Sequence, residues 1–442
     1  MRFDSFFSLL DYWTQLQPDH PAFIFERDGK QILSYHAFRE RVQEKAAMLR
    51  DCGYHSIGVL CDGQIDCVIA LFACTAAKVQ AVLLDPALPS DLREEQMLYT
   101  DVDCLLDTTG ALCPVERLHI PVAPAGQRFL FFTSGTTDEA RAVMLTEKNL
   151  CSSAFNGASM LPLKQDDLLM CLLPLNHVFG FVCGMLWGLH CGATVALGRG
   201  LRFLGADCAY FRPSAVSLVP AMLDLLLHKE LLNEELKTVL VGAGPCPADL
   251  IVKAQSKGLH VSFGYGLTET SSGVAISVED DPFALSACPD DVISIAEDGE
   301  ILITSPTCMM QGYYKDRQMT EEVLRCGVLS TGDIGYLDAQ GKLHITGRKK
   351  DVLVLPNGTK LFLPEYERRI SAVIPYKDFA VVWKNEKIVL VISGEAYDKN
   401  ELFQALDSVL SRYNPGQQIQ DIQFQKQPLP RTLTGKLMRW KL

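Results

Sequence analysis

Residues 129–146, FLFFTSGTTDEARAVMLT, combine an apolar run with a cluster of hydroxyl groups around one glycine. Backbone N–H groups in a glycine-containing turn, followed by a helix N-terminus, form a concave anion-binding site. The hydroxyls would add donors to phosphate oxygens, and Arg141 would add a fixed positive charge. The spacing is not that of the G-x-x-x-x-G-K-[ST] loop of standard NTPases. Taken alone, such a cluster is more commonly an ordinary turn.

Two further segments carry polar groups at the ends of apolar stretches. The segment PLNHVFG contains His177, and a lone histidine in apolar surroundings is more commonly a satisfied core residue than a catalytic one. The segment GYGLTET ends a predicted strand with Tyr265 and Glu269. The tyrosine ring could stack on a nucleobase, and the carboxylate could bind Mg²⁺. The alternative is a loop with a helix cap at Thr268.

Two more segments lie toward the C-terminus. STGD puts Asp333 on a predicted tight turn, where a carboxylate could accept from both hydroxyls of a ribose, although an ordinary aspartate turn has the same pattern. PRTLTGK presents Lys436 on a glycine-containing tail, and the alternative there is a solvated basic terminus. Each segment taken singly therefore leaves a structural interpretation open.

The order of the segments is more specific than any one of them. TSGTT, PLNH, GYGLTET, STGD with GRKKD, and PRTLTGK together resemble the adenylate-forming superfamily over nearly the whole chain. That superfamily includes acyl-CoA synthetases, the adenylation domains of peptide synthetases, and luciferases. Its members join a carboxylate to ATP, which gives an acyl-adenylate and pyrophosphate, and a thiol then attacks the adenylate. Adenylation supplies the leaving group that a carboxylate lacks, and the charge that develops must be stabilised by placed donors and cations.

The resemblance implies roles for individual residues. Thr133 to Thr137 would cradle the β- and γ-phosphates, Tyr265 would stack on adenine, and Asp333 would bind the ribose with Arg348 nearby. The implied nucleotide-binding residues are Thr133, Ser134, Gly135, Thr136, Thr137, Arg141, Gly242, Ala243, Gly244, Gly264, Tyr265, Gly266, Asp333 and Arg348. The implied catalytic residues are Lys436, His177, Thr268 and Glu269, with Glu269 as the metal ligand and Lys350 as the hinge.

The catalytic residues and the hinge would act in different half-reactions. Lys436 would bridge the acyl carboxylate and the α-phosphate, which Thr268 would also reach. His177 would form a gate beside the acyl carboxylate. Rotation about Lys350 would carry Lys436 away and bring in a thiol-binding face, a switch between the two half-reactions.

The phosphate loop departs from the family pattern, which continues after TSGTT as Gly-x-Pro-Lys-Gly. Here the corresponding residues are Asp138, Glu139, Ala140, Arg141 and Ala142. Arginine keeps the charge and can bond two phosphate oxygens. A carboxylate at position 138 facing a triphosphate would be repelled by about 1–4 kcal/mol. The alternatives are that it pairs with Arg141, binds Mg²⁺ or points into solvent, and the affinity for ATP depends on which holds.

The elements that must position these residues follow an alternating pattern. Short apolar runs at 56–61, 79–85, 129–134, 168–173, 193–198, 237–244 and 260–266 are predicted as strands, and amphipathic segments lie between most of them. That alternation predicts an α/β fold with mostly parallel sheets, whose loops at the carboxyl ends of strands bind ligands. We expect a large adenylating domain that binds ATP and the acid at 1–349 and a small mobile α+β lid domain at 350–442.

Composition excludes several classes of protein. The formal net charge of -12 argues against a nucleic-acid binder. The 15 cysteines include no CxxC pair, which favours reduced thiols in the cytoplasm, and no signal peptide is evident. Residues 168–198 hold no Asp, Glu, Lys or Arg, but proline, histidine and glycine interrupt them, so a strand, a loop and a buried helix are expected rather than a transmembrane segment.

Three functional hypotheses follow. The first is an ATP- and Mg²⁺-dependent ligase that activates a fatty or aromatic carboxylic acid and passes it to coenzyme A. The second has the same first step but loads the phosphopantetheine thiol of an acyl carrier protein. The third is a non-catalytic relative that binds nucleotide or acyl groups. The apolar side chains that follow His177 favour an uncharged tail, and the acid itself is not specified by the sequence.

Overall fold

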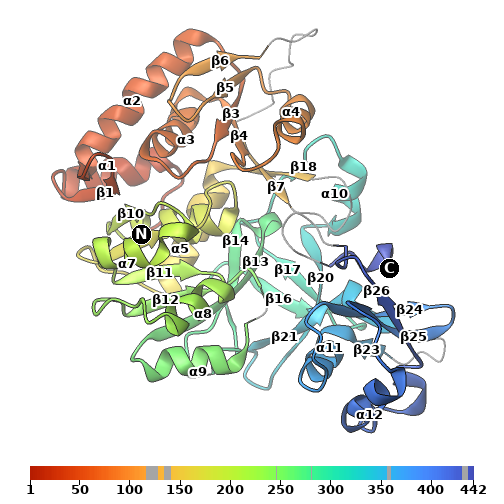
Figure 1. Cartoon of the computed structure of the whole chain (residues 1–442). Coiled ribbons are helices and arrows are strands. Elements are labelled where there is room, and N and C mark those ends of the chain that lie inside the picture. The colour runs from red at the N-terminus through yellow and green to blue at the C-terminus, as the bar shows by residue number, and fades with distance from the viewer. Residues whose placement is uncertain (116–127, 134–140, 245, 280, 356–359, 431–436) are drawn as a thin grey trace.

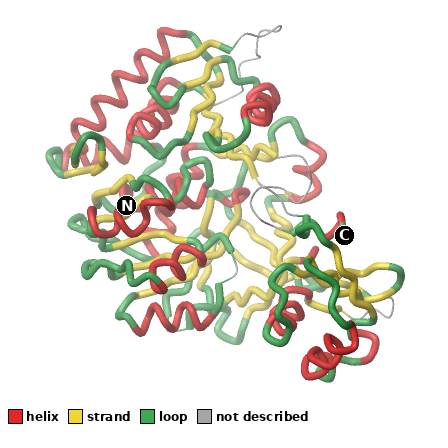
Figure 2. The backbone as a smooth tube through the Cα atoms, viewed as in Figure 1, coloured by secondary structure: helices red, strands yellow, loops and turns green. Residues whose placement is uncertain are grey.

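The computed structural model describes residues 1–115, 128–133, 141–244, 246–279, 281–355, 360–430 and 437–442 (Figure 1). Three large sheets and their covering helices form most of the molecule, and a smaller unit of helices and short sheets follows at the C-terminal end. Figure 2 shows that helices cover the strands of the N-terminal part, while the strands that precede the C-terminal unit have few helices beside them.

The first sheet has seven strands in the order β18-β8-β7-β4-β3-β5-β6. Its centre, from β7 through β4 and β3 to β5, is parallel, and its outer pairs are antiparallel. The strands are β3 (Ser56–Leu60), β4 (Gln80–Leu84), β5 (Cys104–Leu106), β6 (Leu112–Pro114), β7 (Phe129–Thr133), β8 (Arg141–Leu145) and β18 (Gly312–Tyr313).

The second sheet has nine strands in the order β15-β14-β13-β12-β11-β9-β10-β1-β2. All pairs from β13 to β1 are parallel, and the two ends are antiparallel. The strands are β1 (Pro21–Glu26), β2 (Lys30–Ser34), β9 (Leu168–Cys171), β10 (Thr194–Leu197), β11 (Ala215–Leu218), β12 (Thr238–Val241), β13 (His260–Leu267), β14 (Ser272–Ile276) and β15 (Ser286–Ala287).

The third sheet is antiparallel throughout, with the order β16-β17-β20-β19 and β21 beside β20. Its strands are β16 (Val292–Ile295), β17 (Glu300–Thr304), β19 (Leu324–Arg325), β20 (Val328–Leu337) and β21 (Leu343–Arg348). The sequence interpretation predicted seven strands of the two parallel series, left out their strands β1, β5 and β11, and did not include this third sheet. Buried and less buried residues alternate along β17 and β20, so neither strand forms the apolar run that marks a buried parallel strand.

Helices follow the strands of the first two sheets. They are α1 (Phe6–Leu16), α2 (Tyr35–Cys52), α3 (Ile65–Ala77), α4 (Ser90–Tyr99), α5 (Glu147–Met160), α6 (Trp187–His190), α7 (Leu204–Phe211), α8 (Pro220–His228), α9 (Ala248–Ser256) and α10 (Arg317–Val323). A π-helical segment, Phe179–Leu186, leads into α6. Helix α5 begins where the Thr146 hydroxyl accepts from the backbone N–H of Asn149 at 3.1 Å, a capping box.

The C-terminal unit contains β22 (Val352–Val354), β23 (Lys360–Phe362), α11 (Leu363–Ser371), β24 (Phe379–Lys384), β25 (Lys387–Ser393), α12 (Lys399–Leu410) and β26 (Asp421–Gln425). Its largest apolar cluster draws only on residues 355–422, whereas the main N-terminal cluster draws on residues 3–343. A large N-terminal and a small C-terminal domain are thus present, as expected. The exact boundary at Lys350 stays a prediction.

The predicted elements agree closely with the observed ones in the first two sheets. Strands expected at 56–61 and 79–85 correspond to β3 and β4, with α3 between them. The uncharged stretch 168–198 forms β9, a loop, the π-helical segment, α6 and β10. In the part of the chain that the structure describes, no helix is long and apolar enough to cross a membrane.

Candidate active site

Asp333 and Arg348 form an ion pair across β20 and β21. The two residues are partners in the strand register, and Arg348 Nε lies 2.7 Å from Asp333 Oδ1. The Tyr265 hydroxyl donates to Asp333 Oδ2 at 2.7 Å, so the GYG and STGD segments are in direct contact. Burial, and then the charge of Asp333, raise the pKa of the Tyr265 phenol, which therefore stays protonated as a donor.

The prediction of a tight turn at Asp333 was wrong. The residue lies inside β20, and its backbone N–H donates to Thr331 Oγ1 at 3.0 Å. The preceding residue, Gly332, has a φ of 70°, which supplies the local change of direction that the sequence pattern suggested. The carboxylate is 6% exposed, so it is held by the strand on the inner side of the sheet.

A second group of contacts joins Glu269 to the first sheet. The Tyr313 hydroxyl donates to Glu269 Oε1 at 2.7 Å, and the guanidinium carbon of Arg141 lies 5.7 Å from the centre of the Tyr313 ring. Burial, and then the Glu269 charge, raise the pKa of the Tyr313 phenol. Thr268 and Glu269 belong to the single helical turn Thr268–Thr270 that follows β13. Glu269 and Arg141, which the sequence predicted as site residues, are thereby linked.

The hairpin of β7 and β8 carries the predicted phosphate loop. Thr133 and Arg141 are opposite each other in the register of the two strands, so they mark the two ends of the loop. Ser134, Gly135, Thr136, Thr137 and Asp138 lie outside the described residues, as does Lys436. A helix N-terminus was expected directly after the loop, and this was wrong: strand β8 follows it, and α5 begins only at Glu147.

Glycines allow three loops to meet at the carboxyl ends of β12 and β13. A Cβ at Gly242 would lie 3.1 Å from Phe179 Cζ and 3.3 Å from the carbonyl oxygen of Gly264. Phe179 begins the π-helical segment two residues after His177. Phe179 of the PLNHVFG segment, Gly242 and Gly264 therefore lie together. Ala243 has a φ of 62°, a conformation that is uncommon outside glycine.

The remaining two glycines of this group have different surroundings. A Cβ at Gly266 would lie 1.7 Å from the carbonyl oxygen of Ser272, so the bulge between β13 and β14 has no room for a side chain there. Among the described residues, a Cβ at Gly244 would meet nothing closer than 4.0 Å. Close packing thus requires glycine at residue 266, whereas the described surroundings of residue 244 leave room for a side chain.

His177 lies in the loop between β9 and the π-helical segment. Its side chain is exposed at the surface, and its backbone N–H donates to the carbonyl oxygen of Pro174 at 3.2 Å. Partial removal of the imidazole from water lowers its pKa, while the negative charge of Asp85, which follows β4, raises it. The exposed position removes the alternative of a satisfied core histidine. The neighbouring Asn176 is buried, and its side-chain oxygen has no hydrogen-bond donor within the described residues.

The predicted hinge follows the ion-paired end of β21. Lys349 Nζ lies 2.6 Å from Asp298 Oδ2 and 2.8 Å from Glu300 Oε2. Glu300 also accepts from the backbone N–H of Gly332 at 2.8 Å through its other oxygen. The residue before Lys350 is therefore held to the third sheet, next to Asp333. Lys350 itself is exposed within the short helical turn Lys349–Asp351.

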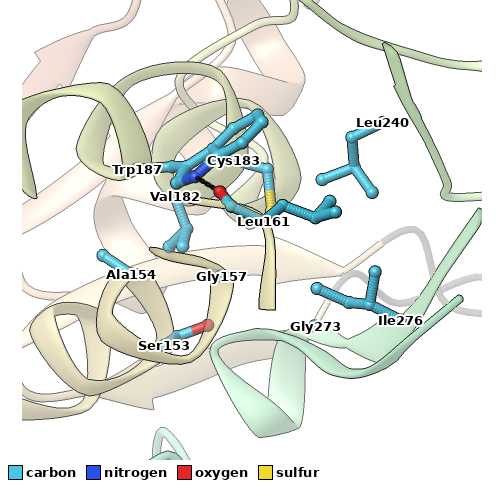
Figure 3. A pocket seen from close by; sticks show the side chains of 10 residues that line it. All are labelled: Ser153, Ala154, Gly157, Leu161, Val182, Cys183, Trp187, Leu240, Gly273 and Ile276. Atoms are coloured by element: carbon cyan, nitrogen blue, oxygen red, sulfur yellow. Dashed lines mark hydrogen bonds between the residues drawn. The ribbon is translucent and has the colours of Figure 1, made fainter. Parts of the chain in front are cut away.

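A small cavity of about 10 Å³ lies between α5, the π-helical segment with α6, and strands β12 and β14 (Figure 3). It is lined by Ser153, Ala154, Gly157, Leu161, Val182, Cys183, Trp187, Leu240, Gly273 and Ile276. Trp187 Nε1 donates to the carbonyl oxygen of Leu161 at 2.9 Å and fixes the indole ring at one side. The lining is uncharged and includes the helix after His177, but none of the residues 242–244 or 264–266 belongs to it. A cavity of this size holds about one water molecule, so the acyl pocket expected between those segments stays a prediction.

The available side-chain ligands suit a magnesium ion that is held partly by the protein and partly by substrate phosphates. Within the described residues, no group of three or more His, Cys, Asp or Glu side chains gathers around one point. Mg²⁺ commonly binds through one or two carboxylates together with substrate phosphates and water. Glu269 suits that arrangement, since among the described residues only Tyr313 donates to its carboxylate, at Oε1.

Sequence reasoning missed Tyr313, Thr331 and Glu300. Tyr313 and Glu300 lie outside the motifs, and each touches a motif residue only because strands pair over long sequence distances. The segment GYYKD around Tyr313 resembles the GYG segment in composition, and that was the available signal. Thr331 is part of STGD, and its hydroxyl donates to the carbonyl oxygen of Ile301 at 2.7 Å.

The fold and the grouped motif residues define an adenylate-forming enzyme. Residues 10–125 and 115–314 match the AMP-binding enzyme family, and the chain belongs to that family. The chain is 27% identical to the 2-succinylbenzoate–CoA ligase of Oceanobacillus iheyensis, in an alignment that covers 97% of each chain. The predicted superfamily is confirmed, and so is the expectation of an AMP-forming acid–thiol ligase. The predicted fold class is confirmed by the similarity to solved structures.

Two solved structures share the fold. One is the O-succinylbenzoate-CoA synthetase (MenE) of Bacillus subtilis with the acyl-adenylate intermediate OSB-AMP, with a TM-score of 0.82, 22% identity and coverage of 98% and 97%. The other is the same synthetase with ATP and a magnesium ion, with a TM-score of 0.81, 23% identity and coverage of 98% of both chains. Both span the small C-terminal domain as well as the large one.

Proposed function

We propose that the chain activates an aromatic carboxylic acid of the 2-succinylbenzoate type and transfers the acyl group to coenzyme A. The observation that carries the proposal is the buried Asp333 carboxylate with Tyr265 and Arg348, in a chain that matches a CoA ligase along 97% of its length. Fatty acids, the other class expected from the sequence, have no support from that relative. A 2-succinylbenzoate-type acid keeps a second carboxylate on its ring, so the uncharged tail that the sequence favoured has no support from it either. A carrier-protein acceptor has none either, since the relative is named for CoA.

The first half-reaction makes the acyl-adenylate. A carboxylate oxygen of the acid attacks the α-phosphorus of ATP, and the bond to the pyrophosphate oxygen breaks. Asp333 would hold the ribose, Thr133 and Arg141 would bind the phosphates from the hairpin, and Thr268 would donate to the α-phosphate. Mg²⁺ bound at Glu269 would neutralise part of the phosphate charge. Lys436 would bridge acid and α-phosphate, and His177 would lie at the entrance for the acid.

The second half-reaction makes the thioester. The sulfur of coenzyme A attacks the acyl carbonyl carbon, the bond to the AMP oxygen breaks, and the thiol proton is lost to solvent. Rotation of the C-terminal domain about Lys350 would separate the two steps. The described cysteines are all free thiols, which supports our proposal of a reducing, cytoplasmic setting.

A pyrophosphate-release screen tests the proposal. The acids are 2-succinylbenzoate, its analogue 4-oxo-4-phenylbutanoate, which lacks the ring carboxylate, and straight-chain acids of graded length. We expect 2-succinylbenzoate to give the highest kcat/KM and coenzyme A to outcompete a holo carrier protein as acceptor. A preference for straight-chain acids would instead support the fatty-acid hypothesis. Failure of every acid to release pyrophosphate would support a non-catalytic relative.

A further inference from the structure

Tyr313 connects three segments that are far apart in the sequence. It lies on β18, which pairs with β8 so that Tyr313 is opposite Val143. Its ring is buried, with 6% of the residue exposed. Its hydroxyl reaches Glu269 at 2.7 Å, and its ring faces the Arg141 guanidinium at 5.7 Å. One side chain thus contacts both the proposed metal ligand and the arginine at the end of the phosphate loop.

The hydrogen bond has a geometric consequence for Glu269. A phenol that donates to one carboxylate oxygen restricts rotation about the last side-chain bond and leaves the charge on the group. The second oxygen then has one preferred direction. Hydrogen-bond partners that orient a metal ligand in this way change metal affinity by about 10–100-fold when removed.

The contact with Arg141 has a separate origin. A guanidinium group over a tyrosine ring is attracted by the negative face of the ring. This contact depends on the aromatic ring and not on the hydroxyl, so the two functions of Tyr313 can be separated by substitution. Phenylalanine would keep the ring contact, and leucine would remove both.

The neighbouring Tyr314 provides a matched control. Its hydroxyl also donates to a carboxylate, Asp101 Oδ2, at 2.9 Å, and its ring is similarly buried, with 8% exposed. Asp101 forms an ion pair with Lys315 just after the C-terminal end of α4, and it is not one of the residues assigned to the site. The two tyrosines thus have the same chemistry and different carboxylate partners.

We propose that Tyr313 is a positioning residue for adenylation, whose hydroxyl orients the Glu269 carboxylate toward the metal ion and whose ring holds Arg141 at the phosphate loop. This inference rests on the proposed function, because it needs Glu269 as metal ligand. It assigns a role to a residue outside the five motifs. It also gives a physical link between the triphosphate site on the first sheet and the metal ligand after β13.

The first test measures metal binding without turnover. Mn²⁺ is titrated into the enzyme with α,β-methylene-ATP, and free Mn²⁺ is followed by electron paramagnetic resonance. We expect Tyr313→Phe to weaken Mn²⁺ binding by about tenfold or more, and Tyr314→Phe to leave it unchanged. The Mg²⁺ concentration for half-maximal pyrophosphate release should rise in parallel, with kcat recovering at saturating Mg²⁺. A general loss of folding would lower kcat at every Mg²⁺ concentration.

The second test separates ring from hydroxyl. Tyr313→Leu should also raise the KM for ATP at saturating Mg²⁺, whereas Tyr313→Phe should leave that KM near the wild-type value. In a double-mutant cycle with Glu269→Gln, the effect of Tyr313→Phe on Mn²⁺ binding should disappear. Thermal melting of each variant checks that the fold is kept.

The outcomes distinguish two kinds of failure. If the wild-type enzyme releases pyrophosphate and binds Mn²⁺ with the analogue, but Tyr313→Phe does both equally well, the positioning role is wrong and the proposed function stands. If the wild-type enzyme neither binds Mn²⁺ with the analogue nor releases pyrophosphate with any acid, the proposed function fails and the inference fails with it.

Discussion

At the residue scale, Asp333 combines burial with two partners that come from different motifs. The loss of a hydrogen bond to a charged group costs about 1.5–3 kcal/mol. Asp333→Ala should therefore raise the KM for ATP by at least about tenfold, since 1.4 kcal/mol corresponds to a factor of ten. Initial rates of pyrophosphate release at varied ATP concentration measure the change. Asp338→Asn, at the far end of the same β20–β21 hairpin, is the control, and an unchanged KM in Asp333→Ala would exclude the ribose role.

Asp291 is a second buried carboxyl, away from the motifs. It accepts from Asn156 Nδ2 at 2.9 Å, and burial raises its pKa to about 7, although hydrogen bonds from Ser305 and Asn156 oppose the shift. A raised pKa in the folded state means that folding favours the protonated acid. The free energy of unfolding should therefore fall as pH rises from about 4 to 7, by at most about 1.4 kcal/mol per pH unit.

The variant Asp291→Asn isolates that effect. It cannot ionise, so its free energy of unfolding should rise by about 2.5 kcal/mol relative to that of the wild type between pH 5 and pH 7.5. Urea unfolding at both pH values measures the difference. Burial lowers the pKa of His190 to about 4, so this residue makes the free energy of unfolding rise with pH between about 4 and 6.5. The effect is the same in the wild type and in the variant, so it cancels from the difference between them. If the difference in unfolding free energy between Asp291→Asn and the wild type does not change with pH, the raised pKa of Asp291 is wrong.

At the element scale, the bulge between β13 and β14 holds Tyr265 and Glu269 in place. Gly266→Ala would force a Cβ to within 1.7 Å of the Ser272 carbonyl oxygen, so the strands must shift. We expect a loss of about 1–3 kcal/mol in the free energy of unfolding. Gly273→Ala, its partner in the register, would meet nothing closer than 4.0 Å and is the control. Equal stability of the two variants in urea unfolding would show that the bulge adapts.

The strands of the first two sheets are the part of the fold that the sequence predicted best. Apolar runs gave β3, β4, β7, β9, β10, β12 and β13 because buried parallel strands are apolar on both faces. The loops after β9, β12 and β13 carry His177, Gly242 and Glu269, at the carboxyl ends of strands where such sheets bind ligands. The third sheet was missed because its strands alternate, and Asp333 was therefore assigned to a turn.

Pairing over long sequence distances accounts for the other omissions. Tyr313 reaches Glu269 only because β18 joins β8 at the edge of the first sheet, and no local pattern records that pairing. Lys349 is likewise held by Asp298 and Glu300, about fifty residues earlier in the chain. Lys436 and the hydroxyls of the phosphate loop stay predictions, because the described residues do not include them.

At the scale of the whole molecule, the separate cores of the two domains make the connection at Lys350 a natural pivot. Lys349 is held by two carboxylates of the third sheet, so motion should begin at the next residue. Lys350→Pro fixes φ near −65° and restricts that motion. We expect one half-reaction to be retained and the other to fall more than tenfold. Single-turnover assays of adenylate formation and of thioester formation from preformed adenylate measure the two rates, and equal rates for both steps would contradict a hinge at this residue.

The pairing of β18 with β8 also has a consequence during synthesis on the ribosome. Strand β8 emerges early, yet the partner of its outer edge, Gly312–Tyr313, is made some 170 residues later. Until then the nascent chain carries an open strand edge beside the phosphate-loop hairpin, and open edges invite pairing with other chains. A chain released before residue 312 should therefore aggregate, and chaperone binding should decline once β18 has left the exit tunnel.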